Sequence, residues 1–467
     1  MFRLHFVVTM TIYRPDPRIL TLGSAFYDPV EPARFPECRP RFLNQWWADR
    51  IGLALDGDDW SRHFCRFEPL ADNLPHPLAL RYHGHQFRVY NPDIGDGRGF
   101  TFAQLDDDQD RLLDLGTKGS GQTPYSRTAD GRLTLKGGVR EVLATEMLEA
   151  LGVNTSKSFA LFETGEALER GDEPSPTRSA VLTRLSHGHI RIGTFQRLAF
   201  FGEVDNINAL VRYCLENLYG EPDHKNNAEN ALRLFDLVSN ATAALAASYL
   251  ASGFVHGVLN SDNINITGES LDYGPWRFTP VWDPDFTAAY FDHYGLYAFA
   301  RQPEAIHWNL AQLGGCLSLV AEAAKLSDML AAWGDRFNEA LMAKMIRRLG
   351  VASTRDDNEL ASALIAALGS REATIDQVFF DWRGGRDPGA NAYPAGPFRA
   401  LAKALESRTR PATHGYWSDD APCSMHIDEI EAIWSAIAER DDWQPFDDKV
   451  AAVRRMGEAM AQDEPRG

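Results

Sequence analysis

Apolar and polar positions alternate in short runs between about residues 82 and 185, and glycine-rich turns separate these runs. The clearest run covers residues 111–118, where leucine and threonine side chains share one face of a predicted strand and Lys118 lies on the other face. Two further apolar runs, residues 158–162 and 179–182, complete a small predicted sheet. This part of the chain is therefore predicted to be rich in strands.

Helical periodicity replaces this alternation in three longer segments. In residues 137–151 the apolar side chains form one stripe, and Glu141 lies off that stripe, free to point elsewhere. Residues 228–250 and 303–326 carry apolar side chains at the same spacing. We therefore expect a small strand-rich lobe, followed beyond about residue 190 by a larger helical lobe.

The chain is long enough for more than one compact lobe, because 467 residues with 44% hydrophobic content can bury a large core. The predicted fold class is α+β. We divide the chain into an N-terminal extension rich in proline, tryptophan and phenylalanine (residues 1–75), a small lobe (residues 76–190) and a helical lobe (residues 191–467).

The charge of the chain excludes two classes of partner. A formal net charge of −18 argues against binding nucleic acid or an anionic membrane, since both require a basic face that offsets phosphate charge. A local basic pocket is compatible with this total. The five cysteines, at positions 38, 65, 214, 316 and 423, show neither a CxxC pair nor the spacing of zinc ligands, which indicates a reducing compartment.

Targeting segments are not expected. The first nine residues are apolar but too short for a signal peptide, and no small-residue cleavage site follows them. No run approaches the roughly 20 apolar residues that span a bilayer. The sequence therefore predicts a soluble, cytoplasmic protein.

Three glycine-rich loops give the first indication of chemistry, at residues 94–99, 117–122 and 129–132. Glycine lets backbone N–H groups approach phosphate oxygens closely, although any one of these loops alone is typical of an ordinary hairpin turn. Lys118 ends a strand and Glu141 lies on the next predicted helix. Kinase-like folds place a nucleotide-binding lysine and its orienting carboxylate in this order, whereas such a pair taken alone is more often a surface pair.

A second group of polar residues follows the apolar start of residues 254–265 and comprises Asp262, Asn263 and then Asp272. Carboxylate and amide oxygens are suited to Mg²⁺ or Mn²⁺, which are hard cations. In the kinase arrangement Asp262 would be the catalytic base, and Asn263 and Asp272 would be metal ligands. The alternative is that these residues only form turns and caps, as Asp and Asn usually do.

Together these segments resemble the SelO (selenoprotein O) family, and their order and spacing match it as well. The resemblance covers roughly residues 20 to 325, and the string Lys-Gly-x-Gly-x-Thr-Pro-Tyr-Ser-Arg at residues 118–127 is its most specific part. The matching segments are residues 82–87, 94–99, 117–127, 139–141, 256–263, 271–275, 302–303 and 308–310.

The resemblance implies a protein-kinase-like bilobal fold that binds ATP in a flipped orientation, so that the α-phosphate is exposed to attack. It implies that Asp262 is the catalytic base, that Glu141 orients the lysine, and that Asn263 and Asp272 hold Mg²⁺ or Mn²⁺. The residues implied to contact the nucleotide are Gly95, Gly97, Arg98, Lys118, Asp130, Gly131, Arg184, Arg191 and Asp272.

The implied activity is that of a protein adenylyltransferase, which transfers AMP from ATP to Ser, Thr or Tyr hydroxyls of proteins. Three alternatives stay open: UMP transfer from UTP with Mn²⁺, ordinary γ-phosphoryl transfer, and a non-catalytic nucleotide-binding scaffold. Members of the family commonly carry a cysteine or selenocysteine near the C-terminus, whereas the last cysteine here is Cys423, so redox control by that device is not expected. The sequence specifies neither the protein substrate nor the oligomeric state.

Overall fold

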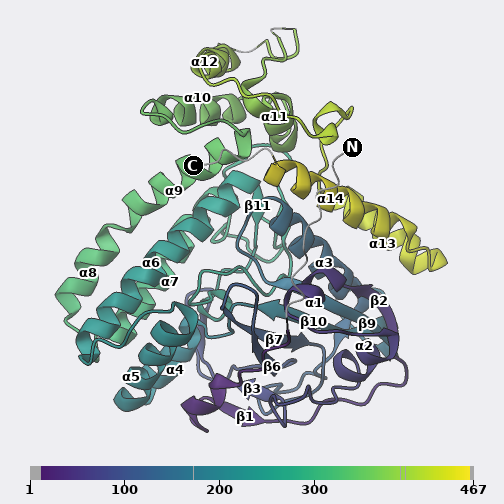
Figure 1. Ribbon diagram of the computed structural model, residues 1–467, viewed down its shortest axis with the longest axis vertical. Helices are drawn as coiled ribbons and strands as arrows, with labels where there is room; N and C mark the ends of the chain where they lie inside the picture. The colour runs from purple at the N-terminus through teal and green to yellow at the C-terminus, as the bar shows by residue number, and fades with distance from the viewer. Residues whose placement is uncertain (1–11, 172, 390, 395, 463–467) are drawn as a thin grey trace.

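The main sheet lies at one end of the computed structural model, which describes residues 12–171, 173–389, 391–394 and 396–462 (Figure 1). Its eight strands pair in antiparallel fashion, and helices make up most of the remainder. The fold is therefore α+β, as predicted. The first nine residues, for which a signal peptide was not expected, lie outside the described ranges.

The sheet has the strand order β1-β3-β6-β7-β10-β9-β2, and β8 pairs with β10. The three strands predicted from apolar runs are present as β7, β9 and β10, and the last two are longer than predicted because their outer ends pair with each other. The strands of the sheet are β1 (Tyr27–Pro29), β2 (Arg39–Leu43), β3 (Leu78–Leu80), β6 (Thr101–Asp106), β7 (Leu112–Lys118), β8 (Leu133–Thr134), β9 (Lys157–Leu168) and β10 (Thr177–Ser186).

The N-terminal segment supplies both edge strands of the sheet, β1 at one edge and β2 at the other. It also supplies the short helices α1 (Gln45–Arg50) and α2 (Gly57–Phe64). The rings of Trp60 and Phe64 on α2 pack on Phe159 of β9, with centroids 5.1 and 5.0 Å apart. This burial explains the aromatic composition of the segment. The predicted boundary between this N-terminal extension and the small lobe at residue 75 stays a prediction.

Helix α3 (Leu135–Ala150) follows β8 and carries Glu141. It begins at Thr134, whose side chain accepts a hydrogen bond from the Gly137 N–H, as an N-cap residue does. Apolar residues of α3 and of the helical part share one core, so this helix is buried on several sides and not only along one stripe. Glu141 is fully buried as well, which requires a charged partner.

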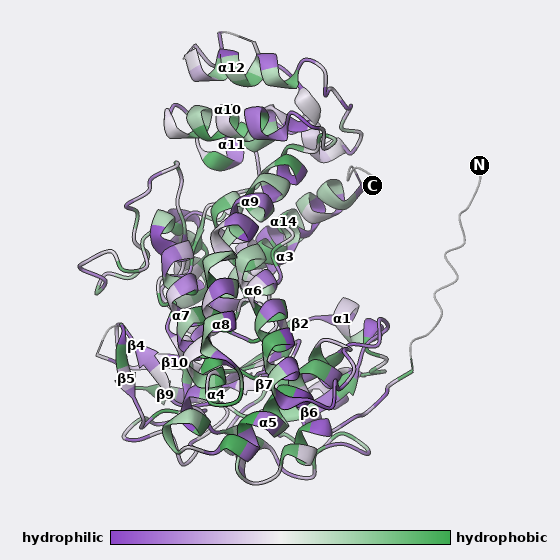
Figure 2. Cartoon of the chain, turned by 90° about the vertical axis from the view of Figure 1, so that its left-hand side faces the viewer, coloured by the Kyte–Doolittle hydropathy of each residue, from purple (hydrophilic) through white to green (hydrophobic). Residues whose placement is uncertain are grey.

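The helical part begins at residue 192 and extends away from the sheet, with α10, α11 and α12 at its far end (Figures 1 and 2). Its helices are α4 (Ile192–Phe200), α5 (Val204–Tyr213), α6 (Asn227–Ser252), α7 (Gln302–Leu317), α8 (Ala323–Ala331), α9 (Trp333–Leu349), α10 (Asp357–Gly369), α11 (Ile375–Asp381), α12 (Gly396–Leu405), α13 (Ile427–Arg440) and α14 (Gln444–Gln462).

The predicted helix at residues 228–250 is confirmed by α6, but the single helix predicted at residues 303–326 is wrong. The chain forms α7, stops at Ser318 and starts again as α8. Two glycines, Gly314 and Gly315, weaken the last turn of α7, and the Ser318 hydroxyl donates to the Gly315 carbonyl. The apolar period continues across the break and so conceals it.

Within the described residues, α6 is the one helix long and apolar enough to cross a membrane by length and composition. Of its most apolar window, 72% is buried against other parts of the protein. Core helices of soluble proteins pass the same test, so this observation is weak evidence for a membrane span.

Two of the five cysteines form a disulfide, whereas the cysteine spacing had led us to expect a protein of a reducing compartment. Cys38, just before β2, and Cys65, at the end of α2, form a disulfide with their Cα atoms 6.0 Å apart. Disulfides are rare in reducing compartments. Cys214, Cys316 and Cys423 are free thiols. The fold of the N-terminal segment brings the pair together across 27 residues, which no spacing rule detects. The cytoplasmic location stays a prediction.

A buried carboxyl makes the stability of the fold depend on pH. Burial raises the pKa of Glu269 to about 7, although Lys157 and the hydrogen bond from the His187 N–H (2.9 Å) oppose the shift. The folded state holds this proton more tightly than the unfolded chain. The contribution of Glu269 to the free energy of unfolding is therefore fully present below the unfolded pKa of 4.5 and is lost as pH rises through about 7.

Glu269→Gln is accordingly expected to stabilise the protein above about pH 7, by up to about 3 kcal/mol, and to have little effect near pH 4.5. The glutamine keeps an oxygen that accepts from His187 and removes the buried charge. Urea unfolding of both proteins at several pH values measures the difference. A difference that does not change with pH would contradict the assignment.

Candidate active site

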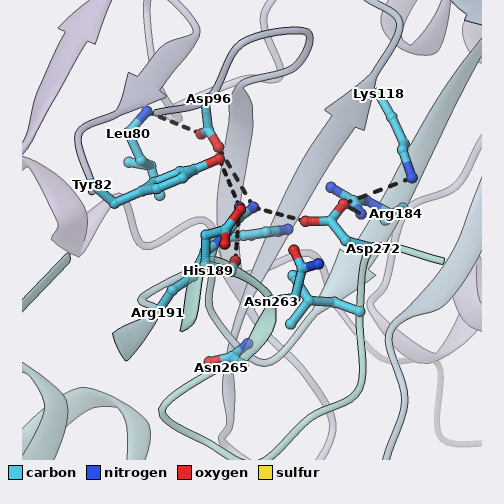
Figure 3. A network of polar contacts seen from close by, with 12 residues as sticks. Leu80, Tyr82, Asp96, Lys118, Arg184, His189, Arg191, Asn263, Asn265 and Asp272 are labelled. Carbon is cyan, nitrogen blue, oxygen red and sulfur yellow. Dashed lines mark hydrogen bonds and ion pairs between the residues drawn. The ribbon is translucent and has the colours of Figure 1, made fainter. Parts of the chain in front are cut away.

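An open cavity of about 460 Å³ lies beside the sheet, and its lining comes mainly from residues 94–99, 117–129, 184–191 and 258–275. A concave site with a few convergent polar groups is the usual form of a ligand pocket. The predicted site residues that line it are Gly95, Gly97, Arg98, Lys118, Arg184, Arg191, Asp262, Asn263 and Asp272. Figure 3 shows several of these side chains converging from separate segments.

The first two glycine-rich loops form one wall of the cavity and require glycine for close packing. A Cβ atom at Gly95 would lie 2.5 Å from the ring of Tyr125, and one at Gly99 would lie 2.1 Å from the Thr117 carbonyl oxygen. The Gly119 N–H donates to the Arg98 carbonyl (2.6 Å), which fixes the two loops to each other. Their backbone is thus held rigidly at the edge of the cavity.

In the third glycine-rich loop Ala129 lines the cavity, whereas Asp130 and Gly131 are not among the lining residues. The Asp130 carboxylate pairs with Arg170 at 2.8 Å and accepts from the Arg132 N–H. Gly131 packs against Gly121, whose carbonyl oxygen would be 2.2 Å from an added Cβ atom. The structure therefore gives both residues local partners, and their contact with a nucleotide stays a prediction.

Lys118 and Glu141 meet in the interior. The Lys118 ammonium donates to a Glu141 carboxylate oxygen, and both side chains are buried. The other Glu141 oxygen accepts from Arg184 at 3.3 Å. Burial lowers the pKa of Lys118, and the negative charges of Glu141 and Asp272 oppose that shift. Glu141 therefore sits behind the cavity, between two cations that face it.

Asp272 is the centre of a cationic cluster. Its carboxylate lies 2.5 Å from Arg184, 3.3 Å from Arg191 and 3.8 Å from the Lys118 ammonium. Burial opposes ionisation of this carboxyl, but the three cations outweigh it and hold its pKa well below the usual range. The backbone φ of Asp272 is 60°, a value that is uncommon for residues other than glycine. Such backbone conformations are often found at functional sites.

Sheet geometry explains why Lys118 and Arg184 lie together. Lys118 on β7 pairs with Leu182 on β10, so Arg184, two residues further along, points to the same face. Arg191 reaches the cluster from the N-terminus of α4. The three cations therefore come from three separate elements (Figure 3).

Two residues that position Arg191 were not identified from the sequence. Arg191 donates to the Tyr82 hydroxyl (2.8 Å) and lies 3.5 Å from the Asp96 carboxylate, which in turn accepts from the Leu80 N–H at 3.0 Å (Figure 3). Burial raises the pKa of Asp96, and Arg191 opposes that shift. The sequence could have indicated Tyr82 and Asp96, because both lie in segments that carried the family resemblance.

Asp262 has the properties of a proton acceptor. Burial raises its pKa to about 6, and the charge of Arg191 and a hydrogen bond to Gln86 oppose the shift. Its Oδ1 atom is buried and has no hydrogen-bond partner in the described part of the chain. A carboxylate oxygen without a partner is costly unless a ligand or substrate completes it. The neighbouring Asn263 donates to the Val258 carbonyl (2.9 Å), which leaves its amide oxygen available.

Residues of α7 brace the loop that carries Asp262. Gln302 accepts from the His256 N–H (2.9 Å) and donates to the Phe254 carbonyl (2.8 Å). Asn309 donates to the Leu259 carbonyl (2.7 Å). His256 in turn contacts the Leu271 carbonyl (2.9 Å), next to Asp272. These buried hydrogen bonds fix the two acidic segments relative to each other.

The residues present fit a divalent cation only in part. Within the described residues there is no group of three or more His, Cys, Asp and Glu side chains suited to a metal. Asn263 and Asp272 offer two hard oxygen donors to the cavity that they line. Mg²⁺ is usually bound by one or two carboxylates together with substrate phosphates, which this donor set matches.

Comparison with known proteins identifies the family of this chain. The family described as "Protein adenylyltransferase SelO" matches residues 10–392. A "Protein nucleotidyltransferase YdiU" of Gloeobacter violaceus is 42% identical over 463 residues, covering 94% of this chain and 95% of the relative. A protein of the same name from Synechocystis is 39% identical, covering 94% of this chain and 97% of the relative. The chain therefore belongs to the SelO family and is a nucleotidyltransferase.

Proposed function

We propose that this enzyme transfers AMP from ATP to Ser, Thr or Tyr hydroxyls of other proteins. The observation that carries the proposal is the cluster of buried cations Lys118, Arg184 and Arg191 around Asp272, beside the unpartnered Oδ1 atom of Asp262. Cations of this kind bind phosphate oxygens, and guanidinium groups can do so through two parallel hydrogen bonds. The cavity therefore combines a phosphate-binding side with a proton acceptor.

The proposal includes a kinase-like division of labour. The sheet with α3 would act as the small lobe and bind the phosphates through the glycine-rich loops and Lys118. The helical part would act as the large lobe and contribute Asp262, Asn263 and Asp272. The pairing of a strand lysine with a helix glutamate supports this assignment, since kinases hold their nucleotide lysine in the same way.

In the proposed reaction, Asp262 accepts the proton of the acceptor hydroxyl as its oxygen attacks the α-phosphorus of ATP. A new oxygen–phosphorus bond forms, the bond between the α-phosphorus and its bridging oxygen breaks, and pyrophosphate leaves with that oxygen. Lys118, Arg184 and Arg191 neutralise charge on the phosphate chain, and Glu141 holds Lys118 in position. Most of the rate would come from positioning and electrostatics.

A divalent cation would be held by Asn263 and Asp272, and its charge would offset that of the phosphates when bound. Asp262 lies beside Asn263 and takes the proton in this scheme, so it needs its free oxygen for the substrate.

Separate α-labelled and γ-labelled ATP, with Mg²⁺ or Mn²⁺, test the proposal. We expect only the α-label to appear on protein, including the enzyme itself. Label from the γ-phosphate alone would establish a kinase. Faster labelling by α-labelled UTP with Mn²⁺ would establish UMP transfer. Nucleotide binding without label from any of these would establish a scaffold.

A further inference from the structure

Four aromatic side chains form an exposed surface beside the cavity, which we call the aromatic platform: Phe87, Tyr290, Phe291 and Tyr294. Their exposed fractions are 36%, 82%, 40% and 92%. Phe291 links two of the others, because its ring centroid lies 5.9 Å from Phe87 and 5.1 Å from Tyr290, and Tyr294 lines the same hollow as Tyr290. Clustered exposed aromatic side chains of this kind mark interaction sites on soluble proteins.

The platform is fixed to the loop that carries Asp262. Phe87 lies at the turn of the hairpin formed by β4 (Gly84–Gln86) and β5 (Val89–Asn91). The Phe87 N–H donates to the Asn260 side chain (3.0 Å), and the Tyr297 hydroxyl donates to the same oxygen (2.7 Å). Phe87 thus joins the loop two residues before the proposed base.

The hairpin also reaches the cavity directly. The His85 N–H donates to the Ser261 hydroxyl at 2.7 Å, and an added Cβ at Gly84 would lie 3.3 Å from the Asp262 Cβ. Gln86 lines the cavity, and Phe87 follows it in the chain. A segment lying on the platform would therefore pass next to Asp262.

The backbone at the turn of the hairpin is strained. Phe87 and Arg88 have φ values of 50° and 63°, in the left-handed region. Two-residue hairpin turns of this type favour Asn and Gly, and a bulky residue there carries an energetic cost. Such strain persists where the surroundings fix it and is concentrated at sites that bind or react. Here it presents the Phe87 ring to Phe291.

Several charged side chains next to the platform have partners within the protein. Arg88 lies 2.8 Å from Glu304, and Arg301 lies 3.3 Å from the other oxygen of the same carboxylate. The Asp292 carboxylate accepts from two backbone N–H groups, of Leu296 and Tyr297, both at 2.8 Å. The exposed Asp285 and His293 line the same hollow as Tyr290 and Tyr294, so the surface is aromatic with polar groups beside it.

We propose that the aromatic platform docks the acceptor protein through an apolar or aromatic side chain close to the hydroxyl that receives AMP. This inference rests on the proposed function. The cationic side of the cavity is taken by the phosphates, so the acceptor approaches Asp262 from the side of the hairpin. Stacking on the platform holds the hydroxyl in reach of the base.

Two fluorescent peptides test the proposal, identical except that one carries phenylalanine and the other alanine two residues after a single serine. Binding is measured by anisotropy without nucleotide, and labelling is measured with α-labelled ATP. We expect roughly tenfold tighter binding and higher kcat/KM for the phenylalanine peptide, as follows from burying one aromatic side chain. Tyr290→Ala combined with Phe291→Ala should remove this preference and leave pyrophosphate release without peptide unchanged.

Trp46→Ala is the matched control, because Trp46 is 53% exposed and belongs to α1, a helix on the opposite side of the molecule from β4 and β5 (Figure 2). It should leave the preference intact. Equal kcat/KM for the two peptides, with labelling of both, would overturn the docking surface but keep the proposed function. Phenylalanine-dependent binding without any α-label would keep the docking surface and overturn AMP transfer. Conversion of a dimer to a monomer by the double variant, with peptide preference unchanged, would assign the platform to a second copy of the chain.

Discussion

Replacing Asp272 with asparagine is expected to reduce AMP transfer by roughly 10²- to 10³-fold or more, as removal of one preorganised electrostatic group does in other enzymes. The carboxylate contacts Arg184, Arg191 and Lys118, so the change leaves three buried cations without their shared partner. It also removes a candidate metal ligand. Initial rates with α-labelled ATP measure the loss.

The same substitution should lower Tm, because breaking a buried ion pair costs roughly 3–5 kcal/mol. Asp376→Asn is the matched control. Asp376 is as buried as its partner Arg348, which lies 2.5 Å away, and this pair is absent from the residues that line the cavity. It should lower Tm with little change in rate. Equal losses of rate in the two variants would show that Asp272 acts only through stability, and full activity of Asp272→Asn would make it a turn residue.

The second large effect is expected from Lys118 and Glu141. Lys118→Ala removes a charge that faces the phosphates and should slow transfer by about 10²- to 10³-fold. Glu141→Gln keeps the shape and removes the anchor, so its effect should be smaller. Because the two side chains are in contact and buried, the double variant should lose clearly less than the sum of the two single losses.

Lys136→Ala is the control for this pair, since Lys136 lies on the same helix but pairs with Glu431 at the partly exposed surface. It should leave the initial rate unchanged. Circular dichroism confirms that each variant folds. Strict additivity of the Lys118 and Glu141 losses would mean that the two residues work independently, and the kinase-like assignment of α3 would then have to be abandoned.

Several residues of the cavity were expected from the sequence because the segments that carry them resemble a known family. Alternation ends at Lys118 and the apolar stripe at residues 137–151 leaves out Glu141, but it was their kinase-like order that suggested the pair, since the pattern alone is more often that of a surface pair. Asp96 and Tyr82 were missed because their role depends on Arg191, which arrives from a distant helix. No periodicity describes a contact between segments that are about a hundred residues apart.

The misjudged features of the fold have the same origin. The disulfide between Cys38 and Cys65 depends on how α2 folds back beside β2, and the break between α7 and α8 interrupts an apolar period that continues on both sides. Tertiary packing pairs the Asp130 carboxylate of the third glycine-rich loop with Arg170, and the contact of Asp130 with a nucleotide stays a prediction. Local sequence specifies which elements form, whereas packing decides which loop reaches the cavity.

A crystal structure with a non-hydrolysable ATP analogue and Mg²⁺ tests the central claim most directly, because it locates each phosphate relative to Asp262. The account predicts that the α-phosphate lies next to the Asp262 carboxylate, with the β- and γ-phosphates against the cluster of Lys118, Arg184 and Arg191. A γ-phosphate next to Asp262, with the α-phosphate buried beyond reach of an acceptor hydroxyl, would contradict AMP transfer and indicate a kinase.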